Sequence, residues 1–179
     1  MEARDFVKQL AEATPSLAEL ESCGLASENV KAFIESYTCT VRDHPLTEPS
    51  GSDSLLELLR NWDLSKVEIG LIRFPGFHAE PSGAIHIGCV EADPLILLPN
   101  GEIVVYESGT KDHLLWRVAK SGTAFLDALV IAARFLGRRA VGTIDIDDHE
   151  AARSVALECA AAAGGDRFKD FYTMLLGAM

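Results

Sequence analysis

Five histidines and four cysteines could bind a metal ion, but their spacing does not favour a metal site. The histidines stand at positions 44, 78, 86, 113 and 149, and the cysteines at 23, 39, 89 and 159. No H-E-x-x-H or H-x-x-x-H motif and no C-x-x-C pair occurs. His86 and Cys89 are three residues apart on a predicted strand, where their side chains would point to opposite faces. We therefore predict no metal site, and four reduced, buried thiols.

The densest acidic run, from Asp145 to Glu150, has carboxylates that could hold a hard divalent cation. An EF-hand loop beginning at Asp145 would need glycine at its sixth position and glutamate at its twelfth. The chain has Glu150 and Ala156 at these positions. Capping of a helix by Asp147 or Asp148 explains the run more simply.

Motifs for nucleophilic catalysis or phosphate binding are absent from the sequence. Ser108 and Ser121 each precede a glycine, but neither lies in the G-x-S-x-G turn that exposes a catalytic hydroxyl. No glycine-rich phosphate-binding motif occurs, and the basic pair Arg138-Arg139 is expected to complement a helix C-terminus. We predict no catalytic residues and no cofactor.

Helices are predicted in the N-terminal region of the chain. Apolar residues at helical spacing favour two or three short helices in the first 37 residues. The segment His44–Ser52, with its prolines, glycine and serines, is predicted to be a loop. Ser54 and Glu57 have the spacing of a capping box, which predicts a helix that runs to about Asp63.

Strands are predicted in the middle of the chain, where β-branched residues become frequent and the apolar period changes to two. The segment 74–83, with two prolines and two glycines, is expected to be irregular. Asn100-Gly101 readily supplies the positive φ angles of a tight hairpin turn. The predicted strands cover residues 66–72, 84–90, 95–98, 102–106 and 113–118.

Helical periodicity returns after the last predicted strand. A helix over 123–136 should end at Gly137 and cover the sheet. An alanine-rich helix should follow Asp147 or Asp148, and a short helix should cover 168–175. The whole is one α+β domain with a mainly antiparallel sheet, its strands within about 66–118. Its parts are a helical N-terminal region (1–63), the sheet with its covering helix (66–136) and C-terminal helices (138–179), of which the last could be an appendage.

Composition excludes some partners. The chain has 16 basic and 27 acidic residues and a formal charge of −11, which repels phosphate backbones and anionic lipid surfaces. No window approaches the roughly 20 apolar residues of a membrane span. The first residues, Met1–Phe6, resemble neither a secretory signal nor a transit peptide. We expect a soluble cytoplasmic protein that binds neither nucleic acid nor membranes, in an oligomeric state that the sequence leaves open.

The order of features between Gly88 and Leu129 resembles that of the SUKH superfamily of bacterial immunity proteins. These features are a glycine-ended strand, an apolar strand, a turn with glycine, a strand with an aromatic residue, and a serine-led helix with a Phe-Leu pair. They run here as Gly88–Pro94, Leu95–Leu98, Asn100–Glu102, Val104–Tyr106 and Ser121–Leu129. The chain departs from the family pattern where Glu91 and Ala92 replace the usual glycines. The resemblance implies a cytoplasmic, non-catalytic SUKH-like domain that binds and neutralises a toxin.

Acidic residues around the predicted hairpin are candidates for binding such a partner, since opposite charge would speed association with a basic, nuclease-type toxin. A protein-interaction or regulatory module of the same fold is an alternative, and an enzyme of unrecognised type is a third. A structure without a cleft lined by His86, His113 or the Asp145 cluster would count strongly against the enzyme. The candidate partner-binding residues are Glu91, Asp93, Glu102, Glu107 and Asp112.

Overall fold

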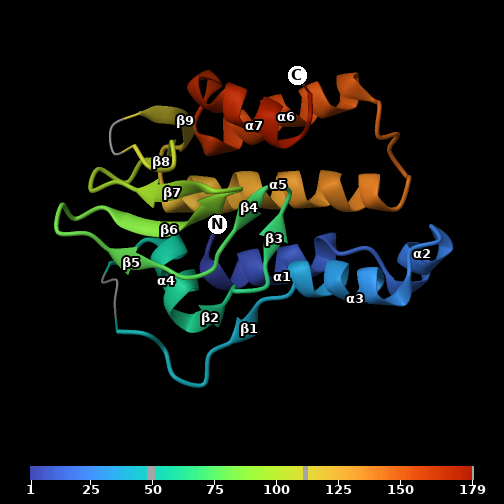
Figure 1. The fold of residues 1–179 in the computed structure, drawn as a ribbon, viewed down its shortest axis with the longest axis horizontal. Coiled ribbons are helices and arrows are strands. Elements are labelled where there is room, and N and C mark those ends of the chain that lie inside the picture. The colour runs from blue at the N-terminus through green and yellow to red at the C-terminus, as the bar shows by residue number, and fades with distance from the viewer. Residues whose placement is uncertain (48–50, 111–112, 179) are drawn as a thin grey trace.

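One antiparallel sheet forms the centre of the fold (Figure 1). The computed structural model describes residues 1–47, 51–110 and 113–178. The strands of this sheet are β3 (Glu68–Ile69), β4 (Ile72–Arg73), β5 (His78–Ala79), β6 (Ile85–Val90), β7 (Asp93–Leu97), β8 (Ile103–Tyr106) and β9 (Leu114–Ala119). They pair in the order β3-β4-β6-β7-β8-β9, with β5 also paired to β6, and every pairing is antiparallel. The predicted α+β fold class is confirmed.

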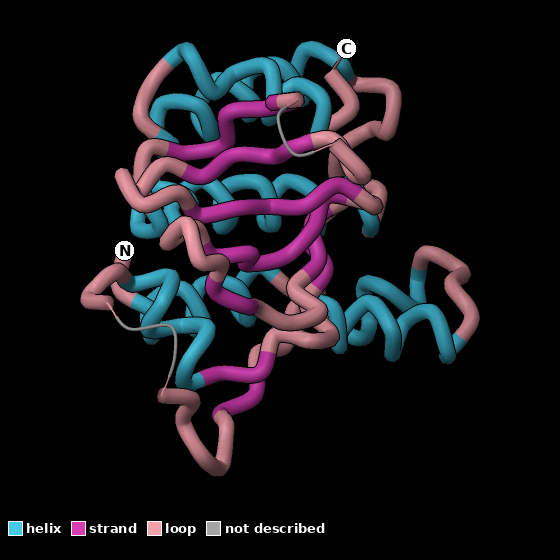
Figure 2. The backbone as a smooth tube through the Cα atoms, turned by 60° about the vertical axis from the view of Figure 1, so that its left-hand side comes forward, coloured by secondary structure: helices cyan, strands magenta, loops and turns pink. Residues whose placement is uncertain are grey.

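Helices cover only one face of the sheet. They are α1 (Ala3–Ala13), α2 (Leu17–Ser22), α3 (Ser27–Ser36), α4 (Ser54–Asn61), α5 (Gly122–Ala140), α6 (His149–Ala163) and α7 (Lys169–Leu175), with a 3-10 turn, η1 (Asp166–Phe168), before α7. The long helix α5 is central, since it contacts the sheet as well as α1, α4 and α6. Figure 2 shows the strands in front and α5 behind them, and no helix of the described residues lies on the other face of the sheet. In the described ranges, no helix is both long and apolar enough to cross a membrane.

The two faces of the sheet differ because side chains alternate along each strand. In β8, Ile103 and Val105 point toward the helices and are fully buried in the main core. Val104 and Tyr106 lie on the opposite face, which we call the open face. A separate small cluster forms there, with Ala84, Ile96 and Val104 buried and Leu98, Tyr106 and Leu114 packed against them.

The predicted hairpin is confirmed as β7 and β8. Its turn is closed by a hydrogen bond from the Gly101 N–H to the Leu98 carbonyl, at 2.9 Å. Gly101 has φ +88, whereas Asn100 is not in the positive region. One left-handed residue after a tight turn is the geometry of a three-residue loop, and glycine adopts it without strain.

Several predicted elements differ from the structure. The helix predicted to reach about Asp63 ends at Asn61, and Trp62–Asp63 forms strand β2, which pairs with β1 (Thr40–Val41). The single strand predicted over 66–72 is instead the tight hairpin of β3 and β4. It turns at Gly70, whose φ of +60 reverses the chain where the apolar alternation continues.

Gly137 does not end the predicted covering helix, because α5 continues to Ala140. A β-carbon at Gly137 would lie 2.7 Å from the carbonyl oxygen of Ala13, so this glycine permits the close approach of the end of α1. The predicted C-terminal helices are confirmed, and Asp148 caps α6 by accepting the Ala151 N–H at 2.9 Å. Their buried residues belong to the main core, so the C-terminal segment is no appendage.

The four cysteines are free thiols, but they are not all buried as predicted. Cys159 is buried between α6 and α5, Cys39 and Cys89 are half-buried, and Cys23 is exposed near the end of α2. Burial raises the pKa of both Cys39 and Cys159 to about 12. These two thiols are therefore poor nucleophiles at neutral pH.

Candidate functional site

A hollow of about 600 Å³ lies on the open face of the sheet. Its floor comes from alternate residues of β7 and its end, Pro94, Ile96 and Leu98. His86 of β6 and Tyr106 of β8 form its sides. The volume and the mainly apolar floor are in the range of ligand-binding pockets in proteins.

A turn lies at each end of this hollow. At one end, the turn between β5 and β6 contributes Glu80, whose carbonyl accepts the Gly83 N–H at 2.9 Å. At the other end, the turn after β8 contributes Glu107, whose carbonyl accepts the Thr110 N–H at 3.2 Å. Both glutamates are exposed, so the hollow is an apolar floor with a carboxylate at each end.

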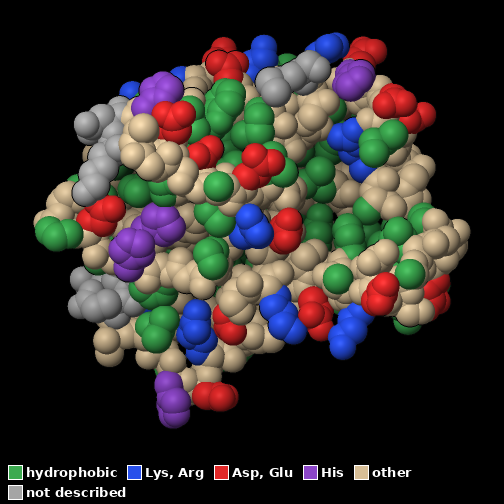
Figure 3. Space-filling view, in the orientation of Figure 1, with side chains coloured by type: hydrophobic (Ala, Val, Ile, Leu, Met, Phe, Trp, Pro, Cys, Tyr) green, Lys and Arg blue, Asp and Glu red, His purple; other side chains and the backbone are tan. Residues whose placement is uncertain are grey.

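Two stacked histidines stand beside the floor. His78 and His86 face each other from β5 and β6 with their ring centroids 4.8 Å apart. Histidine side chains lie together over these two strands at the left of Figure 3. Burial, with the neighbouring His78 as a smaller cause, lowers the pKa of His86. His86 is therefore a neutral aromatic ring at neutral pH, and it has no hydrogen-bond partner within the described ranges.

Three of the predicted partner-binding residues lie together at one end of the sheet. Glu91 is in the turn between β6 and β7, Asp93 begins β7, and Glu107 follows β8. The Asp93 carboxylate accepts the Ser108 N–H at 2.8 Å, which ties β7 to the turn after β8. We call Glu91, Asp93 and Glu107 the acidic edge. It borders the hollow, which Glu107 also lines.

Glu107 makes further contacts within its own turn. Its Oε2 lies 3.0 Å from His113 Nδ1 and accepts a hydrogen bond from Thr110 Oγ1 at 3.3 Å. The hydrogen bonds from His113, chiefly, and from Thr110 lower the pKa of Glu107. The carboxylate is thus charged at neutral pH.

Glu102 does not belong to this group and is removed from the candidate residues. It lies at the opposite end of β8, next to the hairpin turn, and is buried. Its Oε1 accepts a hydrogen bond from Arg117 Nη1 at 2.6 Å, with Arg167 Nη2 3.9 Å away. An acid that is buried and paired inside its own chain offers no charge to a partner. Asp112 lies outside the described residues.

Glu91 has an unusual backbone. Its φ is +54, and among the described residues it is the one non-glycine residue with a positive φ. The Glu91 N–H donates to the Leu71 carbonyl, and Arg73 Nη2 donates to the Glu91 carbonyl, each at 2.9 Å. The β3–β4 hairpin thus holds this turn in place. The sequence has no glycine at this turn, Glu91-Ala92, that would signal the conformation.

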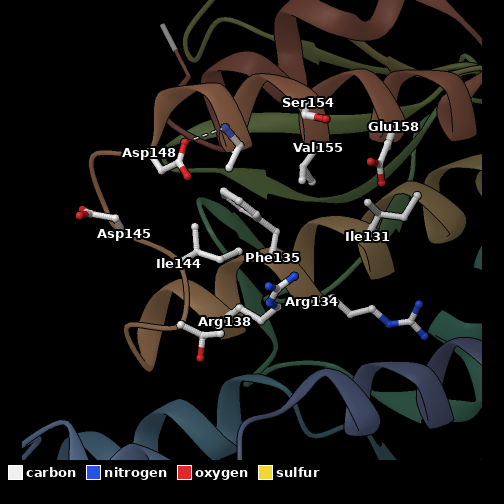
Figure 4. Close-up of a pocket in the computed structure, with 12 residues that line it drawn as sticks. Ile131, Arg134, Phe135, Arg138, Ile144, Asp145, Asp148, Ser154, Val155 and Glu158 are labelled. Atoms are coloured by element: carbon white, nitrogen blue, oxygen red, sulfur yellow. Dashed lines mark hydrogen bonds between the residues drawn. The ribbon is translucent and has the colours of Figure 1, made fainter.

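A second cavity, of about 570 Å³, lies between α5 and α6 (Figure 4). Figure 4 shows Phe135, Ile144 and Val155 between two arginines of α5 and the acids of the opposite wall. Asp148 caps α6 there, and the Asp145 carboxylate accepts the Asp147 N–H at 2.9 Å.

Two acids of the Asp145 run therefore have structural roles: Asp148 caps α6, as the capping interpretation predicts, and Asp145 accepts a hydrogen bond in the preceding turn. Arg134, on the opposite wall, donates a hydrogen bond to Gln9 Oε1 at 2.8 Å. Polar groups on both walls are thus already used by the fold.

His86 lines the hollow on the open face, and Asp145 lines the cavity between α5 and α6. A cleft that an enzyme would need is therefore present in both places. Neither cavity pairs a nucleophile with a base through a hydrogen bond between described residues. In the same ranges, no group of three or more His, Cys, Asp or Glu side chains could hold a metal ion.

Comparison with family models, with curated proteins and with solved structures finds no match for this chain.

Proposed function

We propose that this chain is a non-catalytic protein-binding domain that binds a basic protein on the open face of its sheet. In keeping with the resemblance to the SUKH superfamily, the proposed partner is a toxin domain, of the nuclease type, that the chain neutralises as a bacterial immunity protein. Both proteins would meet in the cytoplasm. The observation that carries the proposal is a helix-free sheet face with an apolar hollow bordered by the acidic edge.

Charge supports a basic partner. The chain carries a formal charge of −11, and the three carboxylates of the acidic edge lie at one end of the open face. Complementary charge raises association rates and suppresses wrong partners more than it raises affinity. The apolar floor of the hollow would supply the desolvated centre that interfaces use for most of their binding energy.

The strained backbone at Glu91 also supports this surface. A non-glycine residue with positive φ costs stability, and such residues cluster where function requires them. The Glu91 carboxylate has no hydrogen bond or ion pair to any described residue. Its presence at a position that favours glycine is explained if the carboxylate meets a partner.

The test is co-expression of this chain with the product of the neighbouring gene. If the proposal is right, the chain relieves growth inhibition by that product and a complex of the two can be purified. A neighbouring product that neither inhibits growth nor binds would argue for the regulatory module instead, as would a gene setting without a toxin.

The role of the acidic edge is tested by charge reversal in this complex. Glu91→Lys with Glu107→Lys should slow association roughly tenfold at low ionic strength and flatten its salt dependence. Glu21→Lys with Glu28→Lys is the matched control, because both glutamates are exposed but lie on α2 and α3, away from the open face. Equal association rates for the double variant and the control would remove the acidic edge from the interface.

A further inference from the structure

We propose that the hollow on the open face binds a partner segment in which an apolar side chain stands between two arginines. This inference rests on the proposed function and deepens it, because it names the chemistry of the contact. The apolar side chain would cover Ile96, and the arginines would pair with Glu80 and Glu107.

The floor of the hollow selects an apolar side chain. Ile96 lies at its middle with Pro94 and Leu98 on either side, and Ala84 adjoins this row. Ile96, Leu98 and Ala84 belong to an apolar cluster, and no helix in the described part of the chain covers it. Burying an apolar group against such a cluster is favourable in proportion to the area removed from water.

The ends of the hollow select positive charge. The register pairs Leu95 with Val105, which brings Pro94 beside Tyr106 and places Glu107 at that end. Glu80 lies at the opposite end, beyond Leu98. Pro94 and Leu98 are four residue steps apart along an extended strand, so the two ends are about 13 Å apart. An extended peptide spans this distance between its first and fifth residues.

The basic residues described on this face do not pair with Glu80 or Glu107, so both glutamates are available to a partner. Of the described residues, those that line the hollow include no lysine and no arginine. The nearby arginines of the face are used elsewhere, Arg117 by Glu102 and Arg73 by the carbonyl of Glu91. Glu80 and Glu107 are exposed, and their partners among the described residues are hydroxyls or a histidine, at Ser82, Thr110 and His113.

The aromatic side chains favour arginine over lysine. His86 and Tyr106 stand on the two sides of the floor, half-buried. A planar guanidinium stacks on aromatic rings and pairs with carboxylates, which the compact ammonium of lysine does less well. The low pKa of His86 keeps its ring uncharged at neutral pH, so it does not repel a guanidinium.

The test uses the blocked peptide Arg-Gly-Leu-Gly-Arg and the free protein, followed by backbone and side-chain NMR shifts in a titration to about 10 mM peptide. The expected result is saturable shift changes at Ile96, Tyr106 and His86. Two control peptides replace either both arginines by glutamate or the leucine by serine. Both should bind more weakly, and a lysine version should lie in between.

Isosteric variants test the two ends of the hollow. Glu80→Gln and Glu107→Gln should each weaken the arginine peptide by roughly two- to fivefold, whereas Glu21→Gln should leave its affinity unchanged. Shift changes that are absent, or that appear elsewhere, would overturn the proposal. Shift changes at the hollow that depend on protein concentration without peptide would also overturn it, because a second copy would then be the occupant.

The peptide titration does not use the toxin, so its failure is distinct from failure of the proposed function. If a complex with the neighbouring product is purified but the peptide does not bind, only the proposed arginine contact is refuted. If the peptide binds but the chain neutralises no toxin, only the proposed immunity role is refuted.

Discussion

Replacement of Glu91 by glycine should stabilise the protein. Glu91 has φ +54 at the first position of the two-residue turn that joins Val90 to Asp93. Its two backbone hydrogen bonds, with Leu71 and Arg73, do not involve the side chain, so they persist in Glu91→Gly. Since the exposed carboxylate contacts no other described residue, the substitution removes the strain and loses no contact within those ranges.

The magnitude follows from two opposing terms. A left-handed backbone costs a non-glycine residue about 1–2 kcal/mol. Glycine returns about 0.4–1 kcal/mol of this gain, because it has more conformational freedom in the unfolded chain. The net increase in the free energy of unfolding is about 0.5–1 kcal/mol. For a chain of this length, that corresponds to a rise of about 1–4 °C in Tm.

Chemical denaturation and thermal unfolding of Glu91→Gly and Glu91→Gln measure this difference. Glu91→Gln removes the charge but keeps the β-carbon, so its stability should equal that of the parent chain. The same stability in both variants would show that the turn is unstrained. A less stable glycine variant would show that the glutamate side chain stabilises the fold, and the argument that it serves a partner would fail.

Three further substitutions test the packing. Gly137→Ala should lower the free energy of unfolding by about 1–2 kcal/mol, because its β-carbon would clash with the Ala13 carbonyl; denaturant titration measures this. Glu102→Gln should cost about 1–2 kcal/mol by the same measurement, because it weakens the charge-assisted hydrogen bond from Arg117. Tyr172→Phe should raise Tm, since the buried Tyr172 hydroxyl has no hydrogen-bond partner in the described part of the chain. An unchanged or lower Tm would show that the hydroxyl has a partner.

The main elements of the fold could be predicted because each has a local pattern. Period-two apolar residues mark β6 to β9, and period-3.6 residues mark α5 and α6. The errors lie where tertiary contact overrides the local pattern. Glycine is typical of a helix end, but Gly137 lies inside α5, where it permits the close approach of α1. The alternation before Ile72 continues across a turn at Gly70 that only the backbone conformation reveals.

The candidate site was predictable only in part. The positions of Glu91, Asp93 and Glu107 around a hairpin follow from its strand order, so their proximity could be expected. The pairing of Glu102 with Arg117 could not be expected, because Arg117 lies on the next strand. The hollow could not be predicted either, because the turns at Glu80 and Glu107 reach it from opposite ends, a relation set by strand register.

The two faces of the sheet divide stability from recognition. The side chains of β8 that point toward the helices are fully buried in the main core, so changes there should unfold the chain before they reveal any effect on binding. On the open face, Glu80, Glu91 and Glu107 are exposed and can be changed without opening a cavity. Glu102 is the exception on this face, because its charge is used within the chain. A partner-binding defect is therefore interpretable at the first three glutamates, whereas at Glu102 it would report on folding.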